Sequence, residues 1–187
     1  MDAKPPTLYF GYGSNLWLAQ MTRRCPGSQY QGIALLPDWK WIINSRHYAN
    51  VIPSTEDEVW GLVYTLTADD EDKLDGYEGV PDAYIKKTMP VQLDRAGKRQ
   101  VVEALVYVDE KRLTPDEPYA EYIDRMNCGI HDAVAEGVPP SYVDRYLRPF
   151  IPGDEKGPLE QVDQGLHLTV GSEASTTEEV GGESASR

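Results

Sequence analysis

The segment GYGSN, residues 11–15, places two polar side chains beside two glycines, directly after the short apolar run of residues 7–10. The glycines permit a tight turn, which would present successive backbone N–H groups together with Ser14 and Asn15 at the start of a helix. Such a helix start binds anions, and a carboxylate would suit it as well as a phosphate. The lysine of a phosphate-binding P-loop is absent. A plain strand-to-helix turn capped by Ser14 or Asn15 is the alternative interpretation.

A second candidate is Glu78, which lies between two glycines in LDGYEGV, residues 74–80. A carboxyl group in a partly apolar pocket has a raised pKa and can exchange protons near neutrality. We expect a helix over residues 67–76, with Glu78 just past its end. The alternative is a solvated glutamate in a surface turn.

Tyrosine is unusually common, with 12 residues against two phenylalanines. Tyrosines beyond Glu78 could line a pocket with their ring faces and hydroxyls, or they could fill the core. These tyrosines are Tyr84, Tyr119, Tyr122, Tyr142 and Tyr146. The three histidines and two cysteines have no metal-ligand spacing and no nucleophile motif. We therefore expect no metal site, and no P-loop, dinucleotide or triad chemistry.

The formal net charge of −13 argues against partners that attract cations, namely nucleic acids and anionic membranes. Residues 153–187 are acidic, rich in Gly, Ser and Thr, and free of aromatic residues, which predicts a disordered tail. Residues 1–152 then form one domain. No apolar run reaches the roughly 20 residues of a membrane span, and no signal peptide is evident. We expect a cytoplasmic protein in a reducing compartment.

Hydrophobic patterning indicates which elements position these candidates. Strands are predicted over residues 7–10, 32–36, 40–44, 59–66, 84–93 and 100–108, the last two forming a hairpin. Residues 47–55 are predicted as a loop. Helices are predicted after the GYGSN loop, over residues 67–76, from residue 119 to residue 137, and over residues 140–149. This order predicts an α+β fold, a curled sheet or small barrel with flanking helices.

Three segments together resemble the γ-glutamylcyclotransferases: LYFGYGSNL at residues 8–16, EVWGLVY at residues 58–64 and LDGYEGV at residues 74–80. The resemblance covers residues 7–151. It implies a small mixed β-barrel with flanking helices that converts a small-molecule γ-glutamyl amide to 5-oxoproline and releases an amine or amino acid. It also implies that no cofactor or metal is used. We expect a monomer or homodimer.

By the same resemblance, Glu78 falls on the family's catalytic general acid/base. The implied substrate-binding residues are Tyr12, Gly13, Ser14, Asn15, Tyr84 and Tyr122. Tyr84 stands one residue closer to Glu78 than in the vertebrate-type enzyme, and Tyr119 competes with Tyr122 as the pocket tyrosine of the long helix. Residues 125–127 resemble fungal members that process glutathione-derived conjugates in secondary metabolism. The alternatives are another amide-cleaving or rearrangement reaction of natural-product biosynthesis on this fold, or a non-catalytic binding module.

Overall fold

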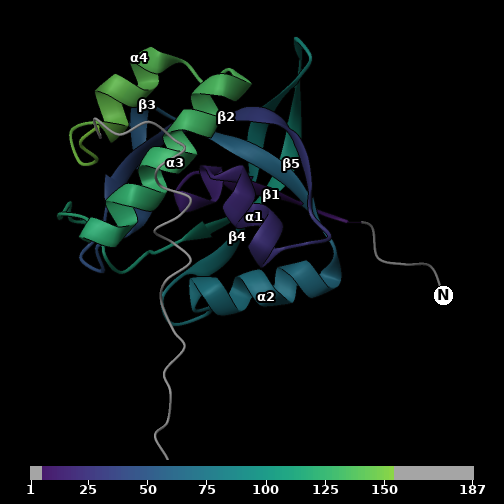
Figure 1. The fold of residues 1–187 in the computed structure, drawn as a ribbon, viewed down its shortest axis with the longest axis horizontal. Helices are drawn as coiled ribbons and strands as arrows, with labels where there is room; N and C mark the ends of the chain where they lie inside the picture. The colour runs from purple at the N-terminus through teal and green to yellow at the C-terminus, as the bar shows by residue number, and fades with distance from the viewer. Residues whose placement is uncertain (1–5, 154–187) are drawn as a thin grey trace, which may run out of the picture.

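A computed structural model describes residues 6–153 of the chain (Figure 1). Its strands are β1 (Thr7–Gly11), β2 (Gln29–Ile43), β3 (Ala49–Leu66), β4 (Ile85–Arg95) and β5 (Lys98–Val108). They form a closed barrel in the order β1-β3-β2-β4-β5. The β1–β5 pairing that closes the barrel is parallel, whereas the other pairings are antiparallel. The α+β fold with a mixed barrel, expected from the sequence, is confirmed.

The helices flank this barrel. A 3₁₀ turn, η1 (Ser14–Leu16), and helix α1 (Leu18–Arg24) follow β1, and α2 (Ala68–Glu78) connects β3 to β4. After β5 come α3 (Ala120–Glu136), α4 (Pro140–Tyr142) and the π-turn η2 (Val143–Leu147). In Figure 1, α3 crosses in front of the strands and α2 lies below them. No helix within residues 6–153 is both long enough and apolar enough to cross a membrane.

The long β2–β3 hairpin differs from the prediction. Residues 32–36 and 40–44, predicted as separate strands, belong to one strand that continues to Ile43, and the predicted loop over residues 47–55 is mostly the first half of β3. Asp38 adopts a left-handed φ of 62°, and the register changes there from Pro37↔Glu58 to Trp39↔Pro53. Residues 54–57 therefore loop out of β3 opposite Asp38. This bulge interrupts the local pattern in both strands, which is why the hairpin was not recognised.

The ends of two helices also differ from expectation. Helix α2 continues two residues beyond the predicted end, so Glu78 is its last residue and Gly79, at φ 64°, is its C-cap. The helix predicted over residues 140–149 is a single α-helical turn followed by a π-turn. The acidic tail predicted after residue 152 lies, except for Gly153, outside the described residues.

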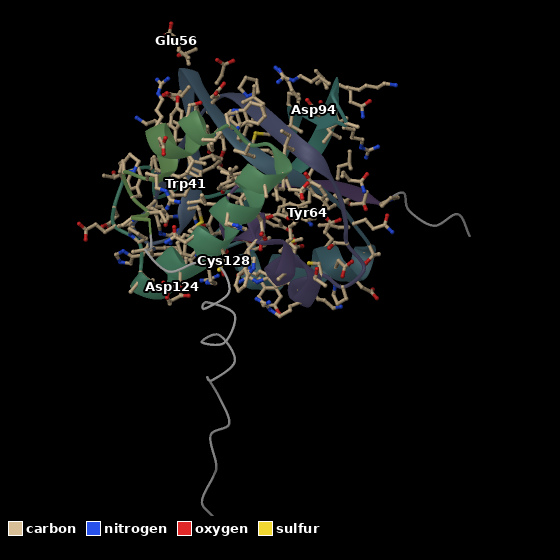
Figure 2. All side chains as sticks on the ribbon, turned by 45° about the horizontal axis from the view of Figure 1, so that its top comes forward. Trp41, Glu56, Tyr64, Asp94, Asp124 and Cys128 are labelled. Atoms are coloured by element: carbon tan, nitrogen blue, oxygen red, sulfur yellow. The ribbon has the colours of Figure 1, made fainter. Side chains whose placement is uncertain are left out.

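One apolar core fills the barrel and continues beneath the helices. Its largest fully buried side chains include Trp41, Phe10, Leu62, Leu93 and Met126. Figure 2 shows Trp41 and Tyr64 inside the molecule, while Glu56 and Asp94 stand at outer ends of the sheet. Helix α3 contacts the loop after β1 closely at Gly129, where a Cβ atom would lie 2.9 Å from the Cβ of Leu16. Glycine at this position therefore sets the distance between α3 and that loop.

Two helical glycines provide a matched test of this contact. A Cβ at Gly76, in α2, would meet no atom within 4 Å, so Gly76→Ala should stabilise the protein by about 0.5–1 kcal/mol through helix propensity. Gly129→Ala gains the same propensity but must push η1 away, because its Cβ would also lie 3.0 Å from the backbone N of Trp17. Overpacking of this kind costs about 1–3 kcal/mol, so a net loss is expected. Urea unfolding measures both values; equal stabilisation by the two variants would contradict the close packing.

Candidate active site

The GYGSN loop leaves the end of β1 and forms the η1 turn rather than the start of an α-helix. The N–H of Leu16 donates to the carbonyl of Gly13 at 2.9 Å, and the N–H of Trp17 donates to that of Ser14 at 3.0 Å. These two N–H groups are therefore used within the turn. Ser14 and Asn15 are buried polar residues, so their side chains must find partners inside the protein.

The Asn15 side chain joins the loop to Glu78. Its Oδ1 accepts hydrogen bonds from Gln20 Nε2 at 3.0 Å and Arg24 Nη1 at 3.1 Å, both on α1. With Oδ1 facing two donors, its amide nitrogen must face the other way. Nδ2 donates to the Tyr9 hydroxyl at 2.9 Å and, more weakly, to Glu78 Oε1 at 3.4 Å. The loop therefore holds one oxygen of the Glu78 carboxyl group.

Glu78 itself is the last residue of helix α2. Thr67 caps its start by accepting the N–H of Asp70 at 3.1 Å, and acidic residues follow in the first turn, where the helix dipole favours them. The left-handed Gly79 ends the helix immediately after Glu78. The carboxyl group thus belongs to a regular element that is fixed at both ends.

The pKa of Glu78 is raised from 4.5 to about 7, and burial of the carboxyl group is the largest cause. The residue as a whole keeps partial exposure, which is consistent with a carboxyl group at the wall of an open cavity. Three arginines, Arg24, Arg125 and Arg46, favour the charged form and partly offset the effect of burial, as does the hydrogen bond from Asn15. A group with this pKa exists in both protonation states at neutral pH, as a general acid/base requires.

A cavity of about 240 Å³ adjoins Glu78. Every site residue implied by the family resemblance lines it. These residues are Tyr12, Gly13, Ser14, Asn15, Glu78, Tyr84 and Tyr122. Tyr142 and Tyr146, in contrast, are buried in the core away from it. Tyr119, the competing candidate, does not line the cavity: it is 49% exposed and its ring lies 4.3 Å from that of His47. The turn of α3 that begins at Tyr119 places Tyr122, only 3% exposed, toward the site instead.

Backbone groups hold the cavity tyrosines in place. Tyr12 donates its hydroxyl to the carbonyl of Tyr107 at 2.6 Å, and Tyr84 donates to the carbonyl of Ala49 at 2.8 Å. The Tyr122 hydroxyl accepts two N–H groups, those of Ser14 and Ala49, each at 3.3 Å. A hydroxyl accepts two hydrogen bonds and donates one, so its hydrogen stays available to an acceptor in the cavity.

Gly13 is required for the contact of Tyr122 with the loop. A Cβ at this position would lie 2.8 Å from the Tyr122 hydroxyl oxygen and 3.1 Å from the Cβ of Ala49. Any larger residue would therefore displace the hydroxyl from the N–H of Ser14. The glycine of GYGSN serves this close approach rather than a positive φ, since its φ is −109°.

Sequence reasoning missed the cationic part of the site. Arg24, Arg46 and Arg125 all line the cavity, and the buried Gln20 donates to Ser14 Oγ as well as to Asn15, both at 3.0 Å. Gln20 and Arg24 are four residues apart on one short helix, so their shared face was a usable signal. Tyr122 and Arg125 are three residues apart on α3, and this spacing, which places two side chains on the same helix face, was a second usable signal. Nothing local to Arg46 indicated its position, because it lies in a turn of the unrecognised hairpin.

The described residues offer neither a metal site nor a reactive thiol beside this cavity. Within residues 6–153, no group of three His, Cys, Asp or Glu side chains could hold a metal ion. Burial raises the pKa of the Cys25 thiol to about 11, so it stays protonated at neutral pH. The chemistry available is a carboxyl group that transfers protons near pH 7, hydroxyl and amide donors, and cations that attract an anionic ligand.

Comparison with known proteins agrees with this architecture. The family model "Gamma-glutamyl cyclotransferase, AIG2-like" matches residues 9–124. The gamma-glutamylcyclotransferase of Bos taurus is 25% identical over 164 residues, which cover 82% of this chain and 84% of the bovine one. A solved structure of an uncharacterised Homo sapiens protein is 26% identical, with a TM-score of 0.68 over 86% of this chain and 98% of the human chain. A solved gamma-glutamyl cyclotransferase shares the fold at 24% identity, with a TM-score of 0.68 over 84% of this chain and 96% of that one.

Glu78→Gln tests the environment of this carboxyl group without an activity assay. Between pH 4.5 and about 7 the folded wild type binds more protons than the unfolded chain, so its stability falls as the pH rises through this window. The variant lacks this loss. Relative to wild type it should therefore gain about 2–3 kcal/mol between about pH 4 and pH 8, at about 1.4 kcal/mol per pKa unit. Urea unfolding at both pH values measures the gain; a difference between the proteins that does not change with pH would contradict the raised pKa.

Proposed function

This chain belongs to the gamma-glutamyl cyclotransferase, AIG2-like family, and from that premise we propose that it converts a γ-glutamyl amide to 5-oxoproline and releases the amine. The single observation that carries the proposal is Glu78, a carboxyl group with a pKa near 7 at the wall of a cavity. A binding module has no need of such a group, whereas ring closure depends on one. The substrate in this proposal is a small γ-glutamyl compound, bound without a metal.

The reaction moves two protons from the attacking nitrogen to the departing one. The α-amine of the substrate is an ammonium ion at neutral pH, and it cannot attack until a base removes a proton. Ionised Glu78 accepts that proton, and the freed amine attacks the γ-carbonyl carbon to form the new C–N bond of the five-membered ring. When the original amide C–N bond breaks, Glu78 returns this proton to the departing nitrogen. The second excess proton of the ring nitrogen then passes through the same carboxyl group to the released amine, which leaves as an ammonium ion. The carboxyl group thus ends in its starting state, and no other reactant is needed.

The neighbours of Glu78 suit these two transfers. Asn15 engages Oε1 at 3.4 Å, which leaves the second oxygen for the substrate. The Tyr122 hydroxyl, which already accepts two N–H groups, can donate its hydrogen to the oxygen of the γ-carbonyl as negative charge develops there. Because the reaction is intramolecular, a cavity that holds the folded conformer of the substrate supplies much of the rate gain, up to about 7–11 kcal/mol.

Replacement of Glu78 tests the proposed role directly. Glu78→Gln retains the shape of the side chain but cannot accept a proton, so kcat should fall by about 10²–10⁴-fold, while binding of a non-reactive γ-glutamyl analogue changes little. Glu78→Asp keeps the carboxyl group but retracts it, and should lose on the order of 10²-fold. The wild-type rate should decline as pH falls below about 7, because protonated Glu78 is not a base.

The assay follows 5-oxoproline release from γ-Glu-Ala, γ-glutamyl-ε-lysine, glutathione and a glutathione S-conjugate. Asp72→Asn, a change to an exposed carboxylate of α2 outside the cavity lining, controls for charge loss. Turnover of every donor by Glu78→Gln at the wild-type rate would exclude the mechanism. It would favour a different reaction on the same fold.

A further inference from the structure

The cavity contains three arginines, and the protein itself engages two of them. Arg24 donates to Asn15 Oδ1 at 3.1 Å and lies 4.7 Å from the centre of the Tyr77 ring. Arg125 pairs with Glu121 through two hydrogen bonds of 2.9 Å, and its Nη1 reaches Ser14 Oγ at 3.3 Å. The charges of both arginines are therefore directed at the GYGSN loop or balanced by an acidic partner.

Arg46 differs from these two. Its guanidinium lies 5.8 Å from the centre of the Tyr84 ring, at the cavity wall. Within residues 6–153, neither a hydrogen bond nor an ion pair engages this guanidinium; the hydrogen bond that Arg46 donates, to Asn44 Oδ1 at 3.0 Å, uses its backbone N–H. Its charge acts at a distance on Glu78, but a guanidinium at a cavity wall without an ion pair is suited to an anionic group of a ligand.

The turn that carries Arg46 is held firmly. The N–H of Asn44 donates to the carbonyl of Tyr48 at 2.9 Å, which closes the turn. Asn44 is fully buried, and its Nδ2 donates to Asp109 Oδ2 at 2.9 Å. Asp109, also buried, binds Arg112 through the same oxygen at 2.9 Å. This buried polar cluster fixes the backbone at Arg46, so the side chain starts from a defined place beside Tyr84.

A γ-glutamyl group carries a single carboxylate, on its α-carbon, and the loop side of the cavity with Ser14 and Arg125 can accommodate it. With that carboxylate bound, the unpaired cation beside Tyr84 remains for a second anionic group of the substrate. We propose that Arg46 binds a carboxylate on the leaving amine, so that the site selects γ-glutamyl derivatives of amino acids or peptides over those of uncharged amines. This inference rests on the proposed function. It assigns the chemical class of the leaving amine, which the cyclisation reaction itself does not determine.

Two donors that differ only in that carboxylate provide the test. γ-Glu-Ala and γ-glutamylethylamide release alanine and ethylamine, which have the same carbon chain apart from the carboxylate. Arg46→Met should reduce kcat/KM for γ-Glu-Ala by about 10- to 100-fold, mainly through KM, which is the usual value of a hydrogen bond to a charged group. It should change kcat/KM for γ-glutamylethylamide by less than about twofold, and Arg46→Lys should recover part of the loss.

Arg99→Met is the matched control, because Arg99 is a mostly exposed arginine outside the cavity lining. It should affect neither donor. An equal loss for both donors in Arg46→Met would place Arg46 at the α-carboxylate and overturn the proposal, as would no loss for either. Melting temperatures identify a variant that fails to fold; in that case Arg46→Lys and Arg46→Gln replace it in the same comparison.

The two possible sources of the carboxylate can be separated in the same assay. An amino acid carries it next to the scissile nitrogen, whereas the dipeptide released from glutathione carries it farther away. A lower kcat/KM of Arg46→Met for γ-Glu-Ala identifies the amino acid as the source of the carboxylate, and a lower kcat/KM for glutathione identifies the dipeptide. An unchanged kcat/KM for both donors contradicts the proposal. If wild type forms no 5-oxoproline from any donor, the proposed function fails. Calorimetric affinities of wild type and Arg46→Met for γ-Glu-Ala and γ-glutamylethylamide then still test the Arg46 assignment.

Discussion

The fixed orientation of the Asn15 amide is the interaction on which the site depends. Two donors from α1 face its oxygen, so its nitrogen must point toward Tyr9 of β1 and Glu78 of α2. One side chain thereby ties strand β1 and helix α1 to helix α2, from which the two long strands β2 and β3 separate them in the chain. The network is buried, so each lost partner would leave a polar atom without a hydrogen bond, at a cost that favours a single arrangement.

The charge of the whole chain and the charge of the site have opposite signs. The chain carries −13, yet the cavity wall contains three arginines and one glutamate. Net charge describes how a protein behaves toward large, distant partners, whereas the selection of a small ligand depends on groups within a few ångströms. Burial of Glu78 and the nearby arginines act against each other on its pKa, and burial has the larger effect. A site with fewer cations would keep Glu78 neutral to still higher pH.

The sequence predicted the elements whose signal is local. The first strand and its loop, the hairpin of β4 and β5, and the apolar stripe of α3 all follow from patterns within short contiguous segments of the chain. The β2–β3 hairpin was missed because its pairing is long-range and a bulge interrupts both strands at Asp38. Arg46 was missed with it. Whether Tyr119 or Tyr122 faces the cavity depends on where α3 begins. Hydrophobic periodicity fixes the start of a helix only to within a residue or two.

The bulge at residues 54–57 has a consequence for how the chain can vary in length. Each side of it has its own ladder of strand pairs, Gln29–Pro37 with Glu58–Thr65 on one side and Trp39–Ile43 with Ala49–Pro53 on the other. Ala49, which binds both Tyr84 and Tyr122, belongs to the second ladder. Residues inserted or deleted at the exposed Thr55 and Glu56 would be absorbed between the ladders and would not shift Ala49 in register. This is the position in the hairpin where evolution can change loop length, or an engineer can insert a peptide, without displacing the tyrosines of the cavity.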